Sequence, residues 1–313
     1  MKNYSSFIKQ FLLVTIFAAV IGAVILLVQS MPKPGPASGR LQVVASFYPL
    51  YFFSQVIGGD KAEVINIVPA GAEPHDYEPT GQDIAKMESS RLIVLNGGRF
   101  EAWADNIKQN IDANKTLIVM AGDGLTTQQM MENGQTGIDP HVWLAPVLAK
   151  KMVDKIAKGF EQVDPVNQVY YQTNAEALKA QLDGLDAAYR QGLSNCQEKN
   201  IITSHAAFGY LAAAYGLNQM PIAGLSPDAE PSPQQLADVV KFAKANNVKY
   251  IFFESLVSPK LAQIIATEVG AQTLVLNPLE GLSGQDLSQG KNYLSVMQGN
   301  LTNLQIGLQC TKE

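Results

Sequence analysis

From Leu41 onward, short runs rich in Val, Ile and Leu alternate with longer segments of helical periodicity. Each half of the chain has four such runs, at 41–46, 64–68, 92–96 and 116–120, and then at 201–204, 220–223, 250–254 and 273–277. Strands that alternate with helices form parallel sheets with helices on both faces. The sequence therefore predicts an α/β fold with two lobes, each a mostly parallel sheet flanked by helices.

A long amphipathic helix is predicted between the halves. Asp164 and Pro165 provide an N-cap followed by proline at the first helical position. Apolar side chains then recur every three or four residues, at Leu178, Leu182, Leu185, Tyr189 and Leu193. A helix of about 29 residues is roughly 43 Å long, more than one lobe needs. We expect it to join the lobes, although an ordinary surface helix of one lobe is the alternative. The predicted parts are a segment at 1–39, a first lobe at 40–163, the helix at 164–193 and a second lobe at 194–313.

The N-terminal segment has the pattern of an export signal. Lys2 and Lys9 precede an apolar run at 11–28, and a stretch rich in Pro and Gly follows it. The run is longer than the core of about 7–15 residues in cleaved signals and reaches the lower limit of about 17–20 for a membrane span. We expect the rest of the chain to lie outside the cytoplasm, held by an uncleaved anchor, with cleavage as the alternative. No cysteine stands at the end of the run to accept a lipid, so a lipoprotein is not expected.

Charge and cysteine content narrow the possibilities further. The chain has 23 basic and 28 acidic residues, a net charge of -5, and no block of basic residues, so we expect no binding to nucleic acid. Outside the cytoplasm, Cys196 and Cys310 are most simply interpreted as one disulfide, with two unpaired thiols as the alternative.

All three histidines of the chain follow strand-like runs or lie in turn-rich connections. They are His75 between two prolines, His141 shortly before a helix that begins near Pro146, and His205 directly after the run 201–204. Ligands of parallel α/β sheets bind beyond the carboxyl ends of the strands, so two histidines of one lobe and one of the other can meet in an interlobe cleft. Imidazole nitrogens suit Zn(II), Cu, Fe or Ni, and three of them leave one corner of a tetrahedral zinc site.

A carboxylate is the candidate for the fourth corner. Glu280, just past the run 273–277, is favoured, and Glu254 at the end of the run 250–254 is the competitor. Glu254 is otherwise expected to cap a helix or to orient a ligand. Asp76 and Asp139 lie beside histidines, where they are candidates to fix an imidazole tautomer by a hydrogen bond, or are simply loop-forming aspartates.

Five motifs lie in order along this part of the chain. They are EPHDYEPT (73–80), DPHVWL (139–144), TSHAAFGY (203–210), GLSPDAEPSP (224–233) and LVLNPLEG (274–281). Together they resemble the zinc/manganese class of extracytoplasmic solute-binding proteins that serve ABC importers. The resemblance runs from Leu41 to nearly the end and implies two α/β lobes, a rigid backbone helix and one metal ion between the lobes. It matches His75, His141, His205 and Glu280 to the four ligand positions of the zinc branch.

The resemblance also implies a choice of metal. Manganese-type members are similar but have a glutamate in place of the third histidine, so His205 favours Zn(II), with Mn(II) as the alternative. Many zinc-type members carry a His/Asp-rich loop in the first lobe, whereas the polar segment 126–137 contains neither histidine nor aspartate and is predicted to be a loop.

The function implied by the resemblance is capture of Zn(II) by a monomer and delivery to an ABC permease in the membrane, without enzymatic activity. Affinity should fall as the histidines become protonated, and release would follow detachment of the ligands of one lobe. A secreted zinc hydrolase with an open water position is one alternative, although the sequence has no HExxH motif. An adhesin that binds host components without metal is another.

Overall fold

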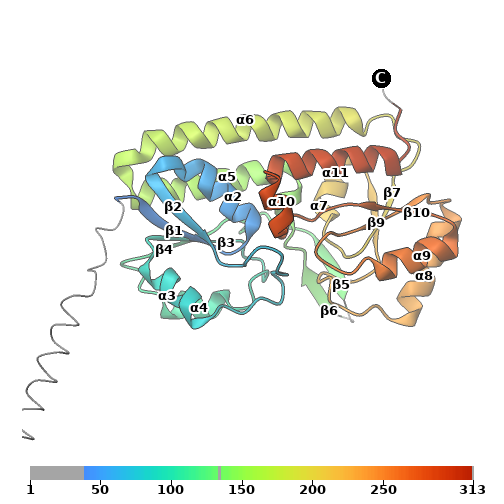
Figure 1. Cartoon of the computed structure of the whole chain (residues 1–313), viewed down its shortest axis with the longest axis horizontal. Coiled ribbons are helices and arrows are strands. Elements are labelled where there is room, and N and C mark those ends of the chain that lie inside the picture. The colour runs from blue at the N-terminus through green and yellow to red at the C-terminus, as the bar shows by residue number, and fades with distance from the viewer. Residues whose placement is uncertain (1–38, 133–134, 312–313) are drawn as a thin grey trace, which may run out of the picture. The chain divides into compact units, whose positions relative to one another are not determined.

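Two four-stranded parallel sheets form the core of the protein (Figure 1). The structure is a computed structural model and describes residues 39–132 and 135–311. The strand order is β2-β1-β3-β4 in one sheet and β10-β9-β7-β8 in the other. The strands are β1 (Leu41–Ala45), β2 (Ala62–Asn66), β3 (Leu92–Leu95), β4 (Leu117–Met120), β7 (Asn200–Thr203), β8 (Asn218–Pro221), β9 (Tyr250–Phe253) and β10 (Gln272–Val275). Each strand overlaps its predicted run, and the two-lobed α/β fold is confirmed.

The chain divides into two units, Met1–Arg40 and Leu41–Glu313, and both sheets belong to the second unit. Only Gly39 and Arg40 of the first unit are described, so the predicted export signal and anchor lie outside the described residues. Within the part of the chain that the structure describes, no helix is both long enough and apolar enough to cross a membrane.

Helices cover both faces of the first sheet. Consecutive strand residues point to opposite faces, so Val43 packs in a cluster with residues of α2 and α5, whereas Val44 packs with residues of α3 and α4. The bounds are α2 (Tyr48–Gly58), α3 (Gly81–Ser89), α4 (Ala104–Asn110) and α5 (Pro146–Val163). With both faces covered, consecutive strand positions can be apolar, as they are throughout β3.

The second sheet is covered in the same way. Ile202 and Ile251 pack on one face with residues of α8 and α9. Ile201 and Phe252 pack on the other face with residues of α7 and α11. The bounds are α7 (Gly209–Tyr215), α8 (Pro233–Ala245), α9 (Lys260–Val269), α10 (Gly284–Ser288) and α11 (Tyr293–Gly307).

Helix α6 (Gln168–Gly192) runs along both lobes (Figure 1). It follows a 3-10 turn at Pro165–Asn167 and packs against α2 and α5 of the first lobe and α11 of the second. Its buried residues are Tyr171, Ala175, Leu178, Leu182, Leu185 and Tyr189. The predicted long helix is therefore present, and its apolar stripe contacts helices of both lobes.

Residues 126–137 differ from the prediction of a plain loop. An antiparallel hairpin forms there, with β5 (Gln129–Glu132) paired with β6 (Gln135–Ile138). The prediction of a loop was wrong. The strands are polar in sequence and have no hydrophobic alternation, so only their backbone pairing reveals them. The Asn133-Gly134 pair between them is the sequence signal typical of a two-residue hairpin turn.

A disulfide joins Cys196, just after α6, to Cys310, just after α11. The two cysteines are 114 residues apart in the sequence. Backbone hydrogen bonds lie beside the disulfide, from Thr311 to the oxygen of Asn195 and from Glu198 to the oxygen of Leu308. The C-terminal end of the second lobe is thereby tied to its beginning.

Candidate metal centre

Four side chains from four separate connections meet between the lobes. They are His75, His141, His205 and Glu280, and their ligand atoms all lie within 4.8 Å of one another. One carboxylate oxygen, Oε1 of Glu280, lies 3.2 Å from Nε2 of His75 and 3.1 Å from Nε2 of both His141 and His205. The structure thus brings together all four residues that the sequence singled out.

The connections that carry these residues lie beyond the carboxyl ends of the strands. His75 follows β2 and His205 follows β7, while His141 precedes the 3-10 turn Val142–Leu144. Glu280 follows β10 in a loop whose backbone is constrained: Leu279, buried and next to Glu280, has a φ of +60°. The left-handed conformation is costly for leucine and is sustained here by surrounding contacts. One of them is the hydrogen bond from the backbone nitrogen of Leu279 to Oδ1 of Asn277, at 2.7 Å.

Two histidines are oriented by carboxylates on the side away from the centre. Asp139 Oδ1 lies 2.8 Å from Nδ1 of His141 and also accepts from the backbone nitrogen of that residue. Glu254 Oε1 lies 2.7 Å from Nδ1 of His205 and accepts from its backbone nitrogen in the same way. A carboxylate at Nδ1 holds the proton there, which leaves Nε2 as the ligand atom. Glu254 therefore orients a histidine and is not one of the four converging groups.

Asp76 does not orient an imidazole in the way that Asp139 does. Its side chain is exposed, and its carboxyl group lies at hydrogen-bonding distance from that of Asp228 in the second lobe. Among the residues that the structure describes, no hydrogen bond joins Asp76 to a histidine. The tautomer of His75 is thus not set by its neighbour in the sequence, unlike that of His141.

Glu73 is a carboxylate that the sequence analysis missed. Its Oε1 accepts a hydrogen bond of 3.2 Å from the backbone nitrogen of His75, and its Oε2 is buried without a partner among the described residues. Burial, followed by repulsion from Glu280, raises the pKa of Glu73 to about 8. The signal was present, because the sequence Glu-Pro-His at 73–75 parallels Asp-Pro-His at 139–141. In both, the acid accepts from the backbone of the histidine two residues later.

The electrostatics of the centre favour a carboxylate anion among imidazoles. Burial acts to raise the pKa of Glu280, but attraction to His205 and hydrogen bonds with the three histidines hold that pKa well below its usual range. Burial acts to lower the pKa of His205, yet Glu254 and Glu280 raise it well above the usual value. The pKa of His141 is raised for the same reasons by Asp139 and Glu280, whereas burial dominates at His75 and lowers its pKa.

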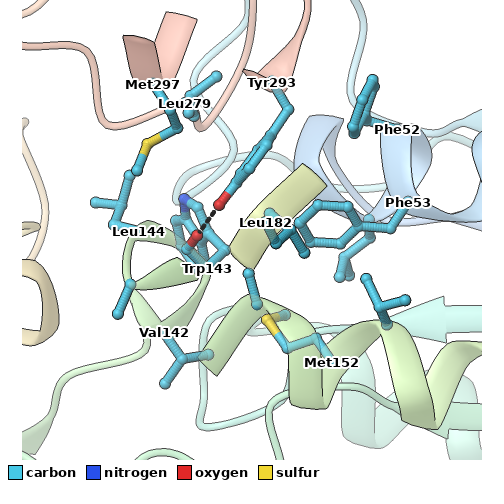
Figure 2. Packing of buried hydrophobic residues seen from close by; sticks show 14 of the residues in the cluster. Phe52, Phe53, Val142, Trp143, Leu144, Met152, Leu182, Leu279, Tyr293 and Met297 are labelled. Atoms are coloured by element: carbon cyan, nitrogen blue, oxygen red, sulfur yellow. Dashed lines mark hydrogen bonds between the residues drawn. The ribbon is translucent and has the colours of Figure 1, made fainter. Parts of the chain in front are cut away.

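Trp143 fastens the loop of His141 to the loop of Glu280. Its indole nitrogen donates to the backbone oxygen of Pro278 at 2.8 Å, and its own backbone oxygen accepts from the hydroxyl of Tyr293 (Figure 2). Trp143 and Tyr293 are fully buried among residues of α2, α5 and α6. Two ligands from different lobes are therefore attached to one hydrogen-bonded, closely packed junction.

The set of donor atoms suits a borderline transition metal. Three imidazole nitrogens and one carboxylate oxygen are a familiar ligand set for Zn(II), whereas all-oxygen sites suit Mg(II), Ca(II) or Mn(II). His141, His205 and Glu280 are each at most 1% exposed. The arrangement can therefore enclose a bare ion.

Comparison with known proteins agrees with this geometry. Residues 43–307 match the sequence model of a family described as zinc-uptake complex component A, periplasmic. The chain is 41% identical over 280 residues to the high-affinity zinc uptake system protein ZnuA of Bacillus subtilis, covering 86% of this chain and 88% of that protein. It is 40% identical over 276 residues to the zinc-binding lipoprotein AdcA of Streptococcus pneumoniae, but that match spans 85% of this chain and only 55% of AdcA.

Solved structures show the same fold. The Zn(II)-bound ZnuA-like domain of Streptococcus pneumoniae AdcA superposes with a TM-score of 0.74 at 40% identity, covering 86% of this chain and 99% of that domain. The laminin-binding protein Lmb of Streptococcus agalactiae, described as an adhesin with metal-transporting activity, superposes with a TM-score of 0.77 at 35% identity, covering 86% of this chain and 99% of Lmb. The chain therefore belongs to the family of periplasmic zinc-uptake component A proteins.

Proposed function

We propose that His75, His141, His205 and Glu280 bind one Zn(II) ion as cargo, and that the protein delivers this ion to an ABC permease. The observation that carries the proposal is the convergence of the four ligand atoms within 4.8 Å in a buried centre. The names of the relatives ZnuA and AdcA, both of which refer to zinc, support the choice of metal.

Delivery, rather than catalysis, suits the ligand set. Four protein ligands complete the tetrahedral shell of a zinc ion and leave no open position for the water that a zinc hydrolase activates. A hydrolase would need Glu280 to act as a general base instead of a ligand, but Glu280 lies equally close to all three imidazoles. The proposal therefore treats the protein as a carrier without enzymatic activity.

Loading should release protons. The raised pKa values of His141 and His205 mean that the metal-free centre retains protons on these imidazoles, and a metal ion competes with them. Zinc affinity is accordingly expected to fall as the pH decreases. The hydrogen bonds between Glu280 and the three imidazoles keep the four ligands together before the ion arrives.

The remaining parts of the proposal concern location and partners. We assign residues 40–163 and 194–313 to the lobes that hold the ion, with the helix predicted at 164–193 as the frame between them. The protein acts outside the cytoplasm as a monomer, retained by the apolar segment 11–28 or released after cleavage. AdcA is named a lipoprotein, but the two cysteines of this chain, at 196 and 310, form the disulfide, so we do not propose lipid attachment.

Loss of a ligand tests the site. We expect His205→Ala and Glu280→Ala each to weaken zinc binding by more than about 100-fold, because removal of a direct ligand should exceed the ~10–100-fold cost of removing an outer partner. The measurement is competition with a chromogenic chelator, with metal content and absorption-edge spectroscopy to identify the element and count its ligands.

Glu268→Ala is the matched control. Glu268 is an exposed carboxylate that pairs with Lys244 on the surface of the second lobe, and its removal should leave zinc affinity as it is. Unchanged affinity in the ligand variants would refute the site. A bound zinc with three protein ligands and an exchangeable water would instead favour the hydrolase, and preferential retention of manganese would favour the manganese carrier.

A further inference from the structure

Tyr210 connects the lobes directly behind the loop of His141. It is the second residue of α7 in the second lobe and is 4% exposed. Its hydroxyl donates to the backbone oxygen of Asp139 at 3.0 Å and accepts from the backbone nitrogen of Gln128 at 2.9 Å. Asp139 in turn donates from its backbone nitrogen to the oxygen of Gln128 at 3.0 Å. The hydroxyl therefore closes the base of the β5–β6 hairpin, which belongs to the chain before α5.

The residue before Tyr210 has little room for a side chain. A Cβ atom on Gly209 would lie 2.7 Å from the carboxylate oxygen Oδ2 of Asp139 and 2.6 Å from Oε1 of Gln128. Real Cβ atoms essentially never lie within 3.0 Å of another non-bonded heavy atom, so a Cβ at this position would force the side-chain end of Gln128, of Asp139 or of both to shift. The side chain of Gln128 also donates to the oxygen of Gly209, at 3.3 Å. The start of α7 therefore packs closely against the side chains of Asp139 and Gln128.

Asp139 links α7 to the metal centre. While its backbone oxygen and Oδ2 face α7, its Oδ1 holds both the ring nitrogen Nδ1 and the backbone nitrogen of His141. A short and continuous path therefore leads from the hydroxyl of Tyr210, through Asp139, to the imidazole. Every member of the path is at least nine-tenths buried.

We propose that Tyr210 is a positioning residue for zinc, which acts from the second lobe on a ligand of the first: through Asp139 it holds the imidazole of His141 in its metal-binding orientation. The inference rests on the proposed zinc site. It implies that His141 does not depend on its own lobe alone. A separation of the lobes that breaks the contact of Tyr210 with Asp139 also loosens His141, so cleft opening and loss of a ligand become one event.

Tyr210→Phe tests this role, because it removes the hydroxyl and keeps the ring. We expect zinc binding to weaken about tenfold, at the low end of the range for outer partners of metal-ligating histidines, and zinc to dissociate faster. Both are measured by chelator competition. The visible spectrum of the Co(II)-loaded protein should also change, because the geometry at His141 differs. That spectrum would not respond to a general loss of stability.

Tyr215→Phe is the matched control on the same helix. The hydroxyl of Tyr215 donates to Asp186 of α6 at 2.9 Å and takes no part in the metal centre. This variant should lose some thermal stability and keep both the zinc affinity and the Co(II) spectrum of the wild type. Gly209→Ala is a second variant on the path: it retains the hydroxyl but crowds the Asp139 carboxylate, and it should weaken zinc binding.

A double-mutant comparison assigns the effect to His141. Once His141→Ala has removed the imidazole, adding Tyr210→Phe should cause no further loss of zinc affinity. Wild-type affinity and spectrum in folded Tyr210→Phe would overturn the proposal, as would an equal loss with and without His141. If His141→Ala alone leaves zinc binding intact, the proposed zinc site itself fails, and the two failures are therefore distinguishable.

Discussion

At the scale of single residues, the centre depends on carboxylates that do not face the metal position. Asp139 in the first lobe and Glu254 in the second each hold the Nδ1 side of one imidazole, together with the backbone nitrogen of the same residue. The imidazoles of His141 and His205 are thereby fixed in rotation and in tautomer before an ion arrives. The entropy cost of ordering these ligands is met during folding, which favours tight binding.

Glu254→Gln should weaken zinc binding by about 10–100-fold. The glutamine amide can donate to Nδ1 of His205, which favours the tautomer with the proton on Nε2, where the metal has to bind. Chelator competition measures the loss, and circular dichroism checks the fold. Glu268→Gln, the same exchange at an exposed surface pair, should have no effect on zinc binding. Equal affinity for the two variants would contradict the role assigned to Glu254.

At the scale of elements, helix α3 defines the end of the loop that carries His75. Thr80 and Asp83 form a reciprocal capping box at its start. Asp83 Oδ2 also accepts from the hydroxyl of Tyr77 at 2.7 Å, and Oδ1 accepts from Lys86 at 2.9 Å. Burial acts to raise the pKa of Asp83, but the hydrogen bonds from Thr80, Lys86 and Tyr77 outweigh burial and hold that pKa well below its usual value. The ionised carboxylate thus anchors the loop to the helix.

Asp83→Ala should lower the free energy of unfolding by about 1–2 kcal/mol at neutral pH, the usual cost of removing a helix cap. Because the pKa is depressed in the folded state, this contribution is present above the unfolded value of about 4 and is lost as the pH falls below it. The difference between wild type and variant should therefore shrink in acid. Urea unfolding from pH 7 downward measures it.

Asp105→Ala provides the comparison for this prediction. Asp105 lies in the first turn of α4 and pairs with Lys108 three residues later, but it is highly exposed. An exposed pair of this kind contributes roughly 0–1 kcal/mol. A loss as large as that of Asp83→Ala, or a difference that does not depend on pH, would contradict the capping argument.

At the scale of the whole molecule, the second unit is held together by α6 and by the junction beneath it. Tyr189 of α6 donates to the backbone oxygen of Met297 in α11 at 2.7 Å, and Asn174 donates to the backbone oxygen of Ile57 in α2 at 3.0 Å. One helix is therefore bonded to both lobes, and the core beneath it is continuous from α2 to α11. Large hinge motion would break this core, so metal exchange has to proceed through small displacements near the cleft.

Removal of the disulfide should destabilise the protein without altering the zinc site. Cys196→Ser with Cys310→Ser opens a closure of 114 residues, and we expect a loss of about 2–5 kcal/mol in the free energy of unfolding. Denaturant unfolding with and without reductant measures it. The wild type should shift toward the variant when reduced, and the variant should not respond. Equal stability of the two oxidised proteins would contradict the prediction, and equal zinc affinity is the expected control.

Much of the fold was predictable because its signals are local. The strands β3 and β9 are continuously apolar since both faces of each sheet are covered, and the heptad-like spacing from Leu178 to Leu193 revealed the long helix. The β5–β6 hairpin was missed because its strands are polar and their signal is only the turn dipeptide. Hydrophobic periodicity cannot report an element whose sequence does not alternate.

Local sequence pattern was enough to predict the two α/β lobes, the helix between them, and the residue types available for a metal, since only three histidines occur and each follows a strand or turn signal. The role of each carboxylate, by contrast, depends on how the chain packs. Glu280 meets the imidazoles, Glu254 orients one of them, Asp76 faces Asp228 of the second lobe, and the hydroxyl of Tyr210 bonds to the loop of His141. These roles depend on distances of about 3 Å between residues far apart in the chain, and local sequence pattern does not encode such distances because they arise when the lobes pack.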